Sequence, residues 1–187
     1  MFCEILEATM LSYALSKTRL NEAAYVLWGT FLLFLTSQIS IPLEPVPITL
    51  QTFGVMLIGL TFPRKTAIHS ILTYLALGAV GVPVFANFSG GFHCLIGPTA
   101  GYLFGFIAAV VCMTSLRPYL NSDNLFHIAF NCLIGTLVIL VFGITWLSTT
   151  LGIKQAIQFG LMPFIFPGII KAILLALAVR YLKSGKN

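Results

Sequence analysis

One lysine in this chain lies where a membrane makes a lysine costly. Lys171 interrupts two apolar segments, residues 164–170 and 172–179. A lysine at mid-bilayer costs on the order of 3 kcal/mol on insertion scales, so such a lysine usually faces a cavity or a partner. Pro167 and Gly168 precede it and free backbone amides. We expect Lys171 to bind an acidic or carbonyl oxygen of a ligand. The alternative is that it reaches the outer headgroups from the first turn of its helix.

Uncharged polar side chains gather in and beside irregular segments of chain. Gln51 follows a proline-rich turn, and Asn87 and Ser89 lie in residues 83–102, a stretch without Asp, Glu, Lys or Arg. That stretch cannot be an ordinary helix, because prolines bracket it and two glycines at 90–91 interrupt it. Irregular backbone at a bilayer edge persists only where it packs into protein or lines a cavity. We therefore predict a binding loop whose amides suit a neutral urea or amide group.

Aromatic side chains in and beside this loop are the predicted walls of the pocket. They are Tyr74, Phe85, Phe88, Phe92 and Tyr102. Because an aromatic residue in a membrane helix more often serves packing or an interface belt, each of them has that alternative role as well.

Residue types exclude several function classes. The predicted spans contain no carboxylate, which leaves no acidic proton relay and no two-carboxylate catalytic pair. The His and Cys residues lack metal-ligand spacing, and the phosphate-binding motif GxxxxGK[ST] does not occur. The basic residues form no stripe, so the net charge of +5 does not indicate nucleic-acid binding. We therefore predict no enzyme, no metal site, no cofactor and no nucleic-acid partner.

The elements that position these residues are predicted to be membrane helices. The chain is 58% hydrophobic and 8% charged, whereas about a quarter of the residues of a soluble domain are charged. Apolar windows near 20 residues long predict an all-α protein with six transmembrane helices. The expected spans are 24–41, 50–62, 67–82, 99–116, 126–147 and 164–181. Gly97, Gly101 and Gly105 recur four residues apart, which predicts a close helix–helix approach.

The predicted membrane domain covers residues 23–182. Residues 1–22 precede it as an amphipathic segment at the membrane surface or as a disordered leader, and a basic tail, 183–187, follows it. Six spans put both termini on one side of the cell membrane. The basic residues expected on that side are Lys17, Arg19, Arg64, Lys65, Arg117, Arg180, Lys183 and Lys186. Since only Lys154 falls opposite, we expect both termini in the cytoplasm and a multi-pass chain whose pocket opens outward.

Three motifs, in the same order along the chain, closely resemble the BioY family. They are QISIPLEPVPITLQ at 38–51, GAVGVPVFANFSGG at 78–91 and GPTAGY at 97–102. The resemblance covers residues 27 to 180. It implies a six-helix substrate-binding (S) component of an energy-coupling-factor (ECF) transporter that binds biotin near the outer face. It also implies partners: a transmembrane T component and two ATP-binding-cassette ATPases, in a lipid membrane.

The resemblance also implies a set of binding residues. These are the loop that closes over biotin, the polar positions beside it and the sixth-helix pattern: Asn87, Ser89, Gly90, Gly91, Gln51, Tyr74, Gly168 and Lys171. We also expect the rings of biotin to lie against Phe85, Phe88 and Tyr102. Polar contacts from Asn87, Gln51 and Lys171 would fix the orientation of the ligand.

Three positions depart from the family pattern. Gly168 stands where the family has an Asp, so that Lys171 is expected to pair directly with a ligand oxygen. Glu44 replaces a small residue. Residues 27–31, Leu-Trp-Gly-Thr-Phe, replace the Ala-xxx-Ala surface expected to dock on the T component.

Other functions stay open on the residues alone. The same architecture could bind another small vitamin. A small membrane enzyme acting on lipid would need acid/base or metal residues at one membrane depth, and the predicted spans provide none. A passive channel would conduct solute without ATPase partners.

Overall fold

A computed structural model describes the backbone of residues 2–121 and 124–184, and the side chains of residues 20–121 and 124–181. In this part of the chain the structure is almost entirely helical. The elements are α1 (Phe2–Gln38), β1 (Ser40–Ile41), β2 (Ile48–Thr49), α2 (Gln51–Thr61), α3 (Arg64–Ala79), η1 (Ala86–Phe88), η2 (Phe92–Leu95), α4 (Ala100–Leu116), η3 (Arg117–Tyr119), α5 (Leu125–Leu151), α6 (Ile153–Gln155), η4 (Ala156–Leu161) and α7 (Met162–Ser184).

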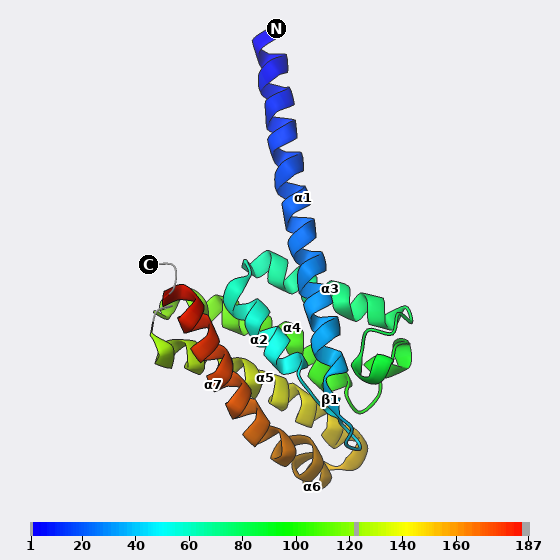
Figure 1. The fold of residues 1–187 in the computed structure, drawn as a ribbon. Coiled ribbons are helices and arrows are strands. Elements are labelled where there is room, and N and C mark those ends of the chain that lie inside the picture. The colour runs from blue at the N-terminus through cyan, green and yellow to red at the C-terminus, as the bar shows by residue number, and fades with distance from the viewer. Residues whose placement is uncertain (1, 122–123, 185–187) are drawn as a thin grey trace.

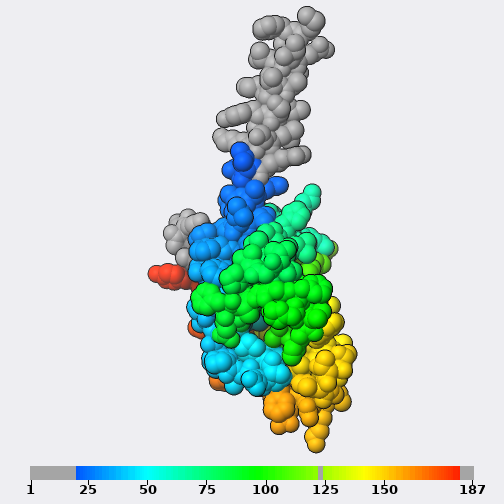
Figure 2. Space-filling view, turned by 90° about the vertical axis from the view of Figure 1, so that its right-hand side faces the viewer, coloured from blue at the N-terminus to red at the C-terminus, as the bar shows by residue number. Residues whose placement is uncertain are grey.

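The helices form one bundle, from which the first part of α1 projects (Figure 1). Helix α4 packs along α5, α1 along α3, and α5 along α7. In Figure 1 the β1–β2 hairpin lies at the lower right of the bundle, and the η1–η2 loop lies on its right-hand side above the hairpin. Figure 2 shows that the loop, in green, lies at the surface directly beside the hairpin region, in cyan.

Three helical segments are long and apolar enough to cross a membrane among the residues that the structure describes. They are Ala100–Tyr119, Leu125–Leu151 and Ile153–Tyr181. Helix α2 is apolar but has only 11 residues. Its N-terminus begins inside protein, next to the hairpin, as expected for a span too short to cross a bilayer alone.

Two boundaries differ from the sequence prediction. Helix α1 runs without a break from Phe2 to Gln38, so the division predicted at residue 22 does not coincide with a helix end. The interfacial role of residues 1–22 stays a prediction. Helix α5 continues to Leu151, and a turn at Gly152, with φ +81°, leads directly into α6 and a π-helical segment. The residues between the fifth and sixth predicted spans are therefore helical, apart from one tight turn at Gly152.

Glycines make the α4–α5 contact close. A side-chain carbon at Gly101 would lie 2.5 Å from the backbone oxygen of Phe142, and one at Gly105 would lie 3.1 Å from the Cα of Ile139. The predicted small-residue contact is confirmed for these two positions. Gly97 instead lies before the helix, where its carbonyl accepts from Trp146 Nε1 at 3.0 Å.

Gly101→Val tests this packing. The added atoms would meet backbone, which cannot rotate away, so we expect a loss of at least about 1–3 kcal/mol in stability, the range for overpacking. The measurement is the thermal melting of purified protein in detergent. Phe104→Val is the matched control because Phe104 on the same helix is 39% exposed. Equal melting temperatures for Gly101→Val and the wild type would contradict the contact.

Candidate functional site

A cavity of about 270 Å³ lies inside the bundle next to the hairpin and the loop. Ligand pockets for small molecules span roughly 300–1,000 Å³, so this volume fits a small guest. The residues that line it come from the hairpin and from α2, α4, α5, α7 and the loop: Val46, Pro47, Thr49, Gln51, Thr52, Phe85, Ala86, Asn87, Ser89, Cys94, Thr99, Tyr102, Leu103, Phe106, Thr136, Ile139, Leu140, Phe164, Gly168 and Lys171.

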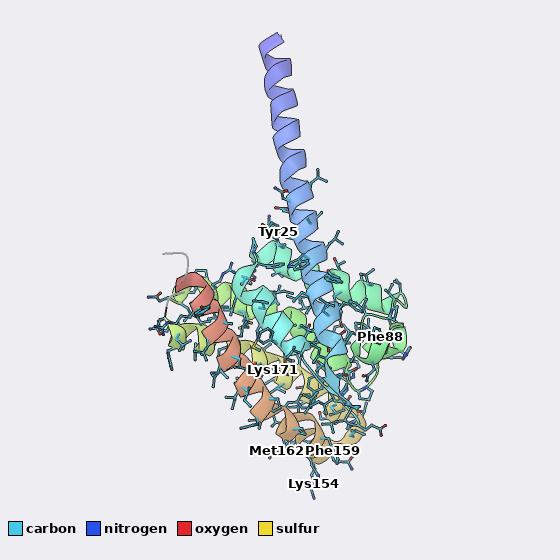
Figure 3. The ribbon with its side chains drawn as sticks, viewed as in Figure 1. Tyr25, Phe88, Lys154, Phe159, Met162 and Lys171 are labelled. Atoms are coloured by element: carbon cyan, nitrogen blue, oxygen red, sulfur yellow. The ribbon has the colours of Figure 1, made fainter. Side chains whose placement is uncertain are left out.

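The Lys171 ammonium points into the bundle. Its Nζ donates to the backbone oxygen of Thr49 at 2.6 Å and lies 3.1 Å from Thr52 Oγ1. Figure 3 shows Lys171 midway along the structure, far from Met162 at the start of α7. This direction disfavours the alternative in which the side chain reaches the outer headgroups. Because an ammonium has three donors, one N–H is left for a ligand.

Gln51 is held by a chain of side-chain hydrogen bonds. Thr49 Oγ1 donates to Gln51 Oε1 at 2.9 Å, and Gln51 Nε2 donates to the hydroxyl of Tyr74 at 2.6 Å. That hydroxyl donates to the backbone oxygen of Val84 at 3.0 Å. Tyr74 is fully buried behind Gln51 and does not line the cavity. Its hydrogen bonds orient Gln51 and hold Val84 of the loop. Gln51 itself lines the cavity and keeps a second N–H for donation.

Gln38 at the end of α1 clamps the loop with both ends of its amide. Nε2 donates to the oxygen of Phe85 at 3.1 Å, and Oε1 accepts from the backbone N–H of Phe88 at 3.0 Å. The clamp holds a strained turn, because Asn87 and Phe88 have φ values of +57° and +54°. Ser40 Oγ donates to Asn87 Oδ1 at 2.8 Å. The amide N–H₂ of Asn87 is therefore left to donate.

The two loop glycines shape the backbone and do not line the cavity. A side-chain carbon at Gly90 would lie 2.4 Å from the backbone oxygen of Val82. Gly91 has φ +109°, and its N–H donates to the oxygen of Gly78 at 2.7 Å. Only glycine fits both requirements. Ser89, by contrast, lines the cavity, and its hydroxyl donates to the Ala86 oxygen at 2.8 Å.

Phe85 and Tyr102 supply the aromatic walls. Phe85 is 3% exposed and meets the Tyr74 ring edge-on, with 5.4 Å between centroids. Tyr102 stacks on Phe164 at 5.7 Å. Its hydroxyl donates to the backbone oxygen of Gly160 at 2.8 Å, inside the π-helical segment η4. The ring of Tyr102 is thus available to a ligand, while its hydroxyl is occupied.

The prediction that Phe88 and Phe92 wall the pocket does not agree with the structure. Phe88 is 64% exposed and Phe92 is 66% exposed, and neither lines the cavity. The left-handed backbone at Phe88 turns its ring outward, toward Phe34 on α1. Figure 3 shows Phe88 at the rim of the molecule, away from Lys171.

Gly168 lines the cavity one helical turn before Lys171. A side-chain carbon there would lie 2.9 Å from Thr136 Cγ2, so the position is crowded from α5. Among the cavity-lining residues that the structure describes, none is a carboxylate. The polar groups with spare hydrogen-bonding capacity are mainly donors, on Lys171, Gln51 and Asn87. This arrangement suits a ligand that presents several acceptor oxygens.

Some site residues carry little signal in the sequence. Gln38 and Ser40 were part of a matched motif, but only the structure shows that they hold the loop. From the sequence alone, Thr52 and Thr136 look like ordinary helix residues, and Phe164 looks like a residue that packs between helices. Nothing in their spacing indicates that α2, α5 and α7 bring them to one cavity. The other departures lie outside it: Glu44 is exposed, and in residues 27–31 only Gly29 and Thr30 are buried, against α3.

Fold and site together define the class: a small, multi-helix membrane protein with a ligand-sized cavity enclosed by a hairpin, a loop and the lysine of its last helix. The chain belongs to the BioY family, whose family model matches residues 9–186.

Named relatives and a solved structure support this membership. The chain is 43% identical over 139 residues to the probable biotin transporter BioY of Pyrococcus horikoshii, covering 73% of this chain and 80% of the relative. It is 38% identical to the biotin transporter BioY of Thermotoga maritima, covering 83% and 91%. A crystal structure of the S-component for biotin from an ECF-type ABC transporter superposes with a TM-score of 0.79 at 27% identity, covering 90% and 93%. The predicted S-component-like bundle is confirmed.

Gln38→Ala tests the clamp. The substitution removes a donor to Phe85 and an acceptor from Phe88, so residues 83–91 should open more often. We expect hydrogen exchange of this segment to accelerate about tenfold, as a loss of about 1.4 kcal/mol from the two hydrogen bonds implies. Gln155→Ala is the control, since Gln155 is exposed and far from the loop. Unchanged exchange in Gln38→Ala would show that the clamp does not hold the loop.

Proposed function

We propose that this chain is the biotin-binding S component of an ECF-type vitamin uptake transporter. The observation that carries the proposal is the pairing of a donor-rich cavity with family membership. Lys171, Gln51 and Asn87 present N–H groups to one small space, and biotin carries acceptor oxygens on its ureido ring and its carboxylate. The named relatives are biotin transporters, which supports a transport subunit and not an enzyme.

The geometry suggests how the chain holds its ligand. The apolar part of biotin would lie against the rings of Phe85 and Tyr102, and the polar groups of Asn87, Gln51 and Lys171 would set its orientation. The loop held by Gln38 lines one side of the cavity with Ala86, Asn87 and Ser89. With Gly168 in the place of a carboxylate, Lys171 would bind a ligand oxygen directly. A T component and two ATPases would drive release, a step for which this chain has no nucleotide-binding motif.

Lys171→Met tests the site directly. Replacing the ammonium with an apolar chain of similar length removes a charged hydrogen bond, so biotin affinity should fall about tenfold or more. Isothermal titration calorimetry of purified protein in detergent measures it.

Lys154→Met is the matched control, because Lys154 is exposed on α6, at the bottom of the molecule in Figure 3 and away from Lys171. The control should bind biotin like the wild type. Absence of saturable biotin binding by the wild type would refute the proposed function, and equal affinity in Lys171→Met would remove Lys171 from the site.

The proposed topology has both termini in the cytoplasm and the cavity at the outer face of the cell membrane. The basic residues support it. Arg64 and Lys65 at the start of α3, Arg117 at the end of α4 and Arg180 near the end of α7 belong to helix ends that lie away from the hairpin (Figure 1). Lys154 lies on the hairpin side (Figure 3). Residues 1–22 would lie at the inner membrane surface, and residues 23–182 would form the membrane domain.

Cysteine labelling in intact cells checks this orientation. In a background with Cys3, Cys94, Cys112 and Cys132 replaced by Ala, we expect a membrane-impermeant maleimide to label Lys154→Cys and to leave Lys65→Cys unlabelled until the cells are permeabilised. Both positions are exposed, so solvent access alone does not separate them. Labelling of Lys65→Cys in intact cells would reverse the topology.

A further inference from the structure

Asn131 on α5 leaves a buried oxygen without a hydrogen-bond partner. The residue is 2% exposed, its Nδ2 donates to the backbone oxygen of Met113 at 3.3 Å, and its Oδ1 is the one buried side-chain polar atom unpaired among the described residues. The bond from Nδ2 identifies which end of the amide is the oxygen. A buried acceptor without a donor costs about 1–3 kcal/mol. The position therefore points to a donor that comes from outside the chain.

Asn131 lies in the wall of a second cavity, of about 500 Å³, that shares no residue with the cavity of Lys171. Its walls include Leu60 at the end of α2, Arg117 at the end of α4, Ile128 on α5 and Val179 on α7. These helix ends lie away from the hairpin and the loop. The second cavity is therefore at the inner end of the proposed topology.

Side chains with hydrogen-bond donors line the same cavity as Asn131. Arg117 Nη1 donates to the oxygens of Leu60 at 3.0 Å and Phe62 at 2.8 Å, which fixes the guanidinium and leaves Nε and Nη2 for a ligand. His127 Nδ1 accepts from the backbone N–H of Asn121 at 3.0 Å, so the neutral ring donates from Nε2. A ligand for this cavity needs anionic acceptor oxygens and, a few bonds away, an O–H or N–H donor.

We propose that the second cavity binds the headgroup of phosphatidylglycerol. The phosphate accepts from Arg117 and from His127 Nε2, and a glycerol hydroxyl donates to Asn131 Oδ1. The acyl chains follow the outward faces of α5 and α7, which expose Leu133 and Leu177 to the membrane. Basic pockets between transmembrane helices at the inner surface suit anionic headgroups. This binding is independent of the proposed biotin site.

The test is binding of dioleoyl phosphatidylglycerol to delipidated, purified protein, measured by native mass spectrometry. The comparison probes are dioleoyl phosphatidylethanolamine and free glycerol phosphate. We expect saturable binding of phosphatidylglycerol that is about tenfold weaker in Asn131→Ala and in Arg117→Gln. Arg180→Gln is the matched control, because Arg180 is an exposed arginine near the same end of α7 and does not line the cavity. It should bind like the wild type.

The remaining outcomes overturn the proposal. Equal retention of both lipids by the wild type and all variants would mean ordinary annular lipid. Binding of free glycerol phosphate as tight as that of the lipid would mean a soluble anion site, and tighter binding of phosphatidylethanolamine would assign a zwitterionic lipid. If the wild type binds none of these probes, the proposal is wrong, and water is the only partner left for Asn131 Oδ1. Arg117 also caps α2 and Asn131 also bonds Met113, so circular dichroism and size-exclusion profiles are used to confirm that these variants fold. Thr61→Val changes another lining residue but leaves both groups in place. This variant should retain binding.

Discussion

An ammonium inside an apolar helix needs oxygen partners, and this requirement organises the hairpin end of the structure. Lys171 satisfies it with the backbone oxygen of Thr49 and the hydroxyl of Thr52. Those contacts tie α7 to the hairpin and to the start of α2, which are far apart in sequence. A charged group at this depth is tolerated because it has partners and a cavity beside it. The same group is then positioned to meet a ligand oxygen.

The irregular loop obeys a related constraint, since its backbone cannot rely on water at the membrane edge. Its carbonyls and amides are bound from two helices: Tyr74 on α3 reaches Val84, and Gln38 on α1 reaches Phe85 and Phe88. The loop is therefore stabilised by side chains that never touch the cavity. Because Gln38 ends α1, a displacement of that helix would strain the clamp directly. This gives a physical link between the first helix and the cover of the site.

Much of this arrangement follows from the sequence, and the parts that do not have identifiable reasons. Apolar windows and prolines predicted the helices, and the lysine in an apolar segment indicated the cavity.

Residue type did not reveal which way a side chain points. Phe88 and Phe85 are three residues apart in one loop, yet the left-handed backbone at Phe88 sends its ring outward while the ring of Phe85 packs on Gly78. Tyr74, which was predicted as a site residue, lies behind Gln51 and does not line the cavity. Length alone did not show that α1 continues through residue 22, because no proline or glycine marks an end there.

The most direct measurement is the structure of the purified chain crystallised or imaged with biotin. The account predicts ligand density in the cavity between Phe85, Tyr102 and Lys171, with the ammonium within hydrogen-bonding distance of a biotin oxygen and residues 83–91 closed above it. Density at another location, or a bound ligand with Lys171 turned away from it, would contradict the account.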